Sequence, residues 1–227
     1  MEMLFFKLHV AWNALPYVLG GVGVTVATVV AAMLLGFICG VPLAVLQVYG
    51  PAWARWPVRV YVWFFRGVPV LLLLFLFYFG LFRLFALDLD AVAACSIVLG
   101  LTSAAYQSQI FRGAIQSLPQ GQMRAARALG MSDSQAVAVI IVPQALRLSI
   151  PGWSNEYSIL LKDSALCFAL GAPDIMARAG AVASRTYEHM AMYIVVGLLY
   201  FLVTWAGVRL LRSLERRVHI PGYMTTG

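Results

Sequence analysis

The chain has 227 residues, of which 62% are hydrophobic and only 11% charged, and its formal net charge is +7. A soluble domain carries about 25% charged residues, and most of the surface of a domain of this size faces water. The composition therefore excludes a soluble globular protein and indicates an integral membrane protein. The scattered arginines are more typical of membrane orientation than of a nucleic-acid-binding patch, so we expect no nucleic-acid partner.

Five apolar runs approach the length of about 20 residues that a helix needs to cross a bilayer. They lie at about residues 18–48, 67–82, 91–111, 147–174 and 190–208. The second run is short unless its helix begins earlier, near Pro57, and Pro69 is expected to kink it. We therefore predict an all-α integral membrane protein with five transmembrane helices, forming a single domain over residues 1–227.

Positive charge is distributed unevenly between the predicted loops. Five spans place the termini on opposite sides of the membrane. With the N-terminus outside, the cytoplasmic segments hold Arg55, Arg59, Arg66, Arg112, Arg124, Arg127, Arg147, Arg209, Arg212, Arg216 and Arg217. The outer segments then hold Lys7, Arg83, Arg178 and Arg185. Because cytoplasmic loops carry the excess of Lys and Arg, we predict the N-terminus outside and the C-terminus in the cytoplasm.

The segment between the third and fourth spans, about residues 117–146, is then cytoplasmic and has the pattern of two short helices. Ser117 with Pro119 is typical of a helix start, and Gly130 of a left-handed helix end. A second helix is predicted from a capping box that begins at Ser132. We expect Pro143 to stop or bend this second helix.

The first of these helices has a smooth face of small residues, Ala125, Ala126 and Ala128. Small residues allow close backbone approach, so such a face suits insertion into a groove of a partner. The alternative is that alanine is simply a good helix former that packs on the chain's own bundle. The alanine spacing alone does not decide between them.

Four motifs resemble those of a known family in order and spacing. They are F-R-G-V-P at residues 65–69, R-G-A-I-Q-S-L-P-Q-G-Q at 112–122, G-Q-M-R-A-A-R-A-L-G at 121–130 with I-I-V-P from residue 140, and N-E-Y-S-I-L-L-K-D-S-A-L at 155–166. The chain resembles permease subunits of bacterial ABC importers, in particular the polar amino-acid family of histidine, glutamine and arginine type. Ala125, Ala126 and Gly130 match its EAA signature. Three positions depart from the family pattern: Arg124 replaces the usual Glu, Gln109 replaces a frequent acid, and Val142 replaces the Leu before Pro143.

The resemblance implies that the cytoplasmic segment is a coupling helix gripped by an ATPase. The residues expected to dock are Arg124, Ala125, Ala126, Ala128, Leu129 and Gly130. The implied partners are a second permease subunit, identical or related, two ATP-binding subunits, an extracytoplasmic amino-acid-binding protein (periplasmic or lipid-anchored) and membrane lipid. The implied location is the bacterial inner membrane. ATP would be bound by the partner subunits, so we expect no cofactor in this chain.

Polar residues within the fourth span indicate a path for a zwitterion, since an ionisable group in hydrocarbon is costly unless paired or wet. The candidates are Asn155, Glu156, Ser158, Lys162 and Asp163. On a helix Glu156 and Asp163 share a face, and Lys162 lies with Asn155 and Ile159. The alternative is that Lys162 and Asp163 are structural or gating residues. If Glu156 contacts substrate, a cationic amino acid is favoured.

Three further residues, Arg66, Gln109 and Arg112, are expected to have gating or structural roles. The sequence contains no phosphate-binding loop, metal-ligand spacing or catalytic constellation, so we predict no enzyme activity, catalytic residue or metal site. Two other classes remain open from the residues alone. An ion-coupled secondary transporter usually shows internal repeats, and a non-transporting membrane scaffold would not need charges within a span.

Overall fold

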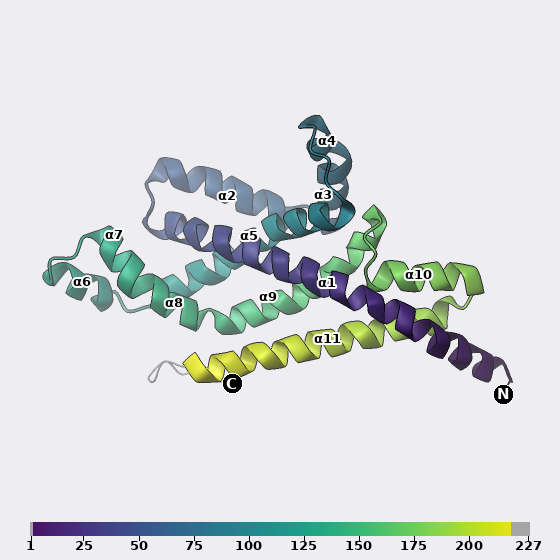
Figure 1. Cartoon of the computed structure of the whole chain (residues 1–227). Coiled ribbons are helices and arrows are strands. Elements are labelled where there is room, and N and C mark those ends of the chain that lie inside the picture. The colour runs from purple at the N-terminus through teal and green to yellow at the C-terminus, as the bar shows by residue number, and fades with distance from the viewer. Residues whose placement is uncertain (1, 219–227) are drawn as a thin grey trace.

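The computed structural model describes residues 2–218, and the side chains of residues 9–217. Within this range every regular element is a helix (Figure 1). In chain order the elements are α1 (Glu2–Tyr49), α2 (Ala52–Gly67), α3 (Val70–Phe75), η1 (Leu76–Leu81), α4 (Phe82–Leu84), α5 (Ala91–Ser117), α6 (Gly121–Ala128), α7 (Asp133–Ala136), η2 (Val137–Ile141), α8 (Val142–Leu148), α9 (Ile150–Asp163), η3 (Ser164–Leu170), α10 (Ile175–Thr186) and α11 (His189–Val218). The predicted all-α class is confirmed.

Three described helices are long and apolar enough to cross a membrane: α1 from His9, α5, and α11 as far as Arg217. Two further spans are possible if each of two bent helix pairs counts as one span. In the first pair α2 meets the α3–α4 segment at 109°, and in the second the α7–α8 segment meets α9–η3 at 57°. The described helices thus give three to five spans, and the count of five stays a prediction.

The second predicted span is not one straight helix. It breaks between Gly67 and Val70, where Val68 is extended with ψ 134° and Pro69 directly precedes α3. A residue before proline is driven out of the helical region, so the kink expected at Pro69 is confirmed. The expectation that Pro143 stops its helix was wrong, because Pro143 lies inside α8, which follows the π-helical turn η2 without a break. The bend comes instead between Leu148 and Ile150.

The core forms where α1 lies against α5 along much of its length. Glycines permit this close approach. A Cβ on Gly36 would collide with the amide nitrogen of Gln107 and lie 3.0 Å from the Ser103 hydroxyl, and one on Gly100 would collide with Leu35. Close packing of this kind replaces the hydrophobic driving force that is missing between helices in a membrane.

The two ends of the molecule differ. Helices α6 and α7 lie at one end, α11 finishes toward that same end, and the first turns of α1 lie at the opposite end (Figure 1). A small apolar cluster joins the α6 end to the bundle through Ala44 of α1, Phe111 and Ile115 of α5, Ile141 of η2 and Ala145 of α8. The segment predicted to be cytoplasmic is therefore anchored to two of the long helices. The side of the membrane on which it lies stays a prediction.

We predict that Gly36→Ala destabilises the protein, whereas Gly23→Ala does not. A Cβ at position 36 must displace the hydrogen-bonded Gln107 amide, while nothing lies within 4 Å of a Cβ at position 23. Overpacking typically costs about 1–3 kcal/mol, and Ala in place of Gly in a helix is otherwise favourable. The thermal midpoint of the purified protein in detergent should fall for the first variant only. Equal midpoints would contradict close α1–α5 packing.

Candidate transport path and docking surface

The helix α6 begins later than the sequence suggested. Ser117 ends α5 and its hydroxyl donates to the Ala114 carbonyl oxygen at 2.8 Å, so it does not cap α6. Leu118 is extended, with ψ 141°, and Gln120 precedes α6 without a side-chain capping bond. The prediction of a start at Ser117 was wrong because α5 continues past Arg112 for more than a turn before the chain changes direction.

The turn after α6 matches the prediction. Gly130 is left-handed, with φ +81°, and the Met131 amide donates to the Ala126 carbonyl oxygen at 3.1 Å, which closes the helix end. Ser132 and Gln135 form the predicted capping box.

An exposed ion pair between Arg127 and Asp133 spans this turn. The Arg127 guanidinium donates two hydrogen bonds to the Asp133 carboxylate, at 2.7 and 3.0 Å. The hydrogen bond from Arg127 lowers the pKa of Asp133 below its ordinary value. Arg124, one turn earlier on α6, makes no ion pair with a described residue.

The predicted docking residues do not all face outward. Arg124, Ala125, Ala128 and Gly130 are exposed, and the Leu129 side chain is 81% exposed. Ala126 is only 1% exposed, so it packs within the chain and the prediction that it lies on the docking face was wrong. A groove of about 650 Å³ lies beside α6, lined by the ends of α1 and α5 and by Met123, Arg124 and Arg127.

Helix α9 presents an open polar face. Asn155, Ile159 and Lys162 are exposed, as the predicted shared face requires, and Asp163 is partly buried. Ser158 is partly buried too, and its hydroxyl donates back to the Ser154 carbonyl oxygen at 3.2 Å. The predicted path residues other than Glu156 therefore lie where a second molecule could reach them.

Glu156 points the other way, into the chain. It is 4% exposed, and the Ser103 hydroxyl donates to one of its carboxylate oxygens at 2.8 Å. Ser103 in turn accepts from the Gln107 amide at 3.0 Å, and Gln107 accepts from the Trp153 indole at 2.7 Å. Gln107 also donates to the Met33 carbonyl oxygen at 3.1 Å, which ties α1, α5 and α9 together.

Sequence reasoning missed Ser103, Gln107 and Trp153. A signal was present, since Ser103 and Gln107 are polar and lie four residues apart, on one face of a predicted span. The chain of donors ends on Glu156, so the protein supplies the hydrogen bond that a buried carboxylate needs. This network fixes the side of α9 that lies opposite its open face.

The three residues expected to be gating or structural are held by local contacts. The Arg66 guanidinium lies over the Tyr106 ring, 5.0 Å from its centre. Gln109 donates to the Gln47 side chain of α1 at 2.8 Å, and Arg112 donates to Gln109 at 3.4 Å. Gln109 and Arg112 therefore link α5 to α1 near the α6 end, a contact that suits a structural role.

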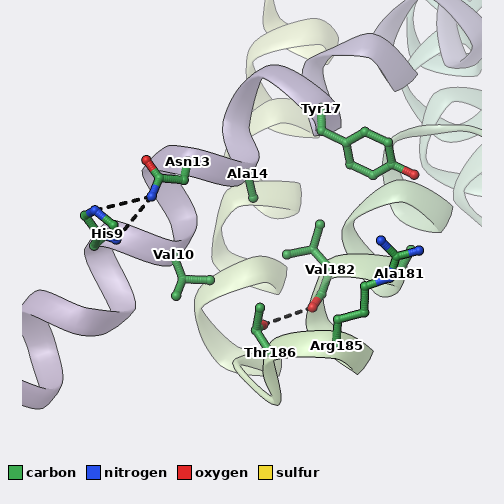
Figure 2. Close-up of a pocket in the computed structure, with 9 residues that line it drawn as sticks. All are labelled: His9, Val10, Asn13, Ala14, Tyr17, Ala181, Val182, Arg185 and Thr186. Carbon is green, nitrogen blue, oxygen red and sulfur yellow. Dashed lines mark hydrogen bonds between the residues drawn. The ribbon is translucent and has the colours of Figure 1, made fainter.

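The opposite end of the molecule has a hollow of about 370 Å³ between α1 and α10 (Figure 2). His9 and Asn13 of α1 are hydrogen-bonded to each other at 3.1 Å, and the Arg185 side chain extends from α10 toward Tyr17 (Figure 2). No group of three His, Cys, Asp or Glu side chains gathers as metal ligands would anywhere in the described part of the chain. This hollow was not foreseen from the sequence.

Comparison with known proteins identifies the family. Residues 32–220 match the model of the binding-protein-dependent transport system inner membrane component. The chain is 35% identical to the probable amino-acid ABC transporter permease protein YckA of Bacillus subtilis, over 87% of each chain. It is 34% identical to the histidine/lysine/arginine/ornithine transport system permease protein HisM of Salmonella typhimurium, over 87% of this chain and 88% of HisM.

A solved structure agrees with these sequence relatives. The crystal structure of an amino acid ABC transporter with histidines superposes with a TM-score of 0.80 and 31% identity, covering 90% of this chain and 95% of that one. The sequence relatives and the structural neighbour thus indicate the same family over nearly the whole chain. The chain belongs to the family of binding-protein-dependent transport system inner membrane components, which are permease subunits of ABC transporters rather than enzymes.

Proposed function

We propose that this chain forms the translocation path for a polar amino acid in an ATP-driven importer of the bacterial inner membrane. The names of the relatives support an amino-acid substrate, and the HisM name favours a cationic one. An ion-coupled secondary transporter and a non-transporting scaffold both fit the family less well. In this proposal α9 lines the translocation path, and α6 contacts the ATP-binding subunit.

The observation that carries the proposal is the open polar face of α9. Lys162 and Asn155 are exposed in the isolated chain although α9 belongs to a candidate span. A lysine that faces hydrocarbon costs several kcal/mol unless it is paired or wet. A second permease subunit that covers this face, with a water-filled path between the two, removes that cost. Asn155, Ser158, Lys162 and Asp163 then line the path, with Glu156 in the wall behind them.

The second support is the exposed apolar tip of the α6 end. Leu129 is 81% exposed beside the small residues Ala125 and Ala128. If this end is cytoplasmic, Leu129, Ala125 and Ala128 form an apolar surface in water rather than in lipid, and a contiguous exposed apolar patch typically marks an interface. We propose that an ATP-binding subunit covers α6, so that ATP is bound by the partners and no cofactor by this chain.

Arg124 places a positive charge on the proposed contact surface of α6. It stands where the family usually has Glu, it is exposed, and it forms no ion pair with a described residue. The ATP-binding subunit should therefore present a carboxylate or a carbonyl group at this position. Two such subunits would grip the α6 helices of two permease subunits.

The mechanism that follows is alternating access. The α6 turn continues through η2 and α8 directly into α9, so a displacement of α6 is transmitted to the path by one continuous run of helices. ATP need only favour one of two states by a few kcal/mol to change which end of the path is open. A binding protein would deliver the substrate at the opposite end, where the hollow of Figure 2 lies.

We predict that Leu129→Glu reduces the amount of ATP-binding subunit that co-purifies with the chain by about tenfold, because a charge would be buried in the contact. Leu84→Glu provides the control. Leu84 is 77% exposed. It ends α4, which lies away from α6 (Figure 1), so this variant should retain the subunit. Undiminished association of Leu129→Glu would argue against docking at α6. The buried Ala126 is unsuitable for this test, since its replacement would disturb the turn itself.

We further predict that Glu156→Gln lowers arginine and lysine uptake more than glutamine uptake, because the buried Glu156 carboxylate, without contacting the substrate, attracts a cation that passes along α9 by its charge. Uptake is measured in vesicles with the complete importer. Ser103→Ala is the matched control, since it removes the neighbouring donor but keeps the Glu156 carboxylate. Equal retention of all three amino acids by Glu156→Gln would rule out this effect of its charge.

A further inference from the structure

The last three turns of α11 place three arginines on one side of the helix. Arg209, Arg212 and Arg216 follow at spacings of three and four residues, which puts them on one face. Together with apolar and aromatic residues of the preceding turns they line a groove of about 420 Å³ along α11. Its lining residues are Phe201, Thr204, Trp205, Val208, Arg209, Arg212 and Arg216. We call this feature the α11 groove.

No described acidic residue pairs with the positive charge of the α11 groove. Glu215 is the nearest acid in the sequence, but it is not among the lining residues. The Arg209 guanidinium is placed by the Trp205 ring, whose centre lies 4.9 Å away. The groove therefore holds three guanidinium groups, none in an ion pair with a described residue, within about 10 Å along the helix axis.

The part of the groove nearer the middle of α11 is apolar apart from Thr204. Phe201 and Trp205 are 63% and 52% exposed, and Val208 is partly buried beside them. Along α11 the order is aromatic and aliphatic side chains first, then guanidinium groups toward the helix end. This order matches a phospholipid, with its acyl chain in the hydrocarbon and its phosphate at the membrane surface.

We propose that the α11 groove binds an anionic phospholipid. Arg209, Arg212 and Arg216 hold the headgroup phosphate, which suits the two-pronged hydrogen bonding of guanidinium groups. One acyl chain lies along Phe201, Trp205 and Val208. This site goes beyond the transport function and uses none of the path or docking residues. A purely orienting role for the arginines would attract anionic lipid only through their total charge.

The test compares two variants that lose the same charge. The groove variant carries Arg209→Gln, Arg212→Gln and Arg216→Gln, and the control variant carries Arg55→Gln, Arg59→Gln and Arg217→Gln, none of which lines the α11 groove. Each full-length protein is purified in its complete importer and titrated with phosphatidylglycerol or phosphatidylcholine of equal chain length, and bound lipid is counted by native mass spectrometry. Gel filtration confirms that the assemblies are intact.

The wild type and the control variant should bind phosphatidylglycerol in preference to phosphatidylcholine. The groove variant should bind phosphatidylglycerol at least about tenfold more weakly than the wild type. Soluble glycerol phosphate should not compete, because it lacks the acyl chain. Equal phosphatidylglycerol binding by the groove variant would overturn the proposal. An equal loss in the control variant would also overturn it, since total charge would then explain the effect. Loss of the ATP-binding subunit from the groove variant, with lipid binding unchanged, would assign the arginines to a protein contact instead.

Discussion

A charge or an unpaired hydrogen-bonding group inside a bilayer must be paired, hydrogen-bonded or wet, and this constraint organises the whole molecule. Helix α9 meets it in two different ways. On one side Glu156 is buried and receives a hydrogen bond from Ser103, within a network that reaches α1 and α5. On the other side Lys162 and Asn155 remain exposed in the single chain. The first arrangement builds a rigid wall, and the second requires a neighbour and water.

The two regions that we assign to function are connected by continuous structure. The turn that begins with Arg127 and Asp133 leads through η2 and α8 to the bend before α9. The same segment is anchored to α1 and α5 through the apolar cluster around Ile141. A partner that displaces α6 would therefore move a stiff unit rather than a loose loop. This coupling is a property of one chain and holds whether the second permease subunit is identical or related.

The sequence predicted the features that local chemistry determines. The left-handed Gly130, the capping box at Ser132 and the kink at Pro69 depend on a few neighbouring residues, and all three are present. The start of α6 was misplaced because Ser117 can cap a following helix or end a preceding one, and its own sequence is compatible with both. The helix through Pro143 was missed because a π-helical turn ahead of it is not encoded by a recognisable pattern.

The candidate site was predicted in outline but not in orientation. Helical spacing placed Lys162 with Asn155, and both are exposed. It could not show that Glu156 faces Ser103, because that contact joins residues 53 positions apart. The inward side chain of Ala126 was likewise missed, since Ala125, Ala126 and Ala128 are identical side chains and only packing against the rest of the chain distinguishes them. Tertiary packing decides these orientations, and a single sequence without the fold does not reveal it.

The central claim is that α6 lies in the cytoplasm and is covered by an ATP-binding subunit. The most direct measurement places a single cysteine by Ala125→Cys in a chain whose Cys39, Cys95 and Cys167 are replaced by serine, and follows its labelling by a membrane-impermeant maleimide. The account predicts labelling in inside-out vesicles stripped of the ATP-binding subunit, protection when that subunit is restored, and no labelling in right-side-out vesicles. Labelling from the outer face, or labelling in inside-out vesicles that the subunit does not reduce, would contradict it.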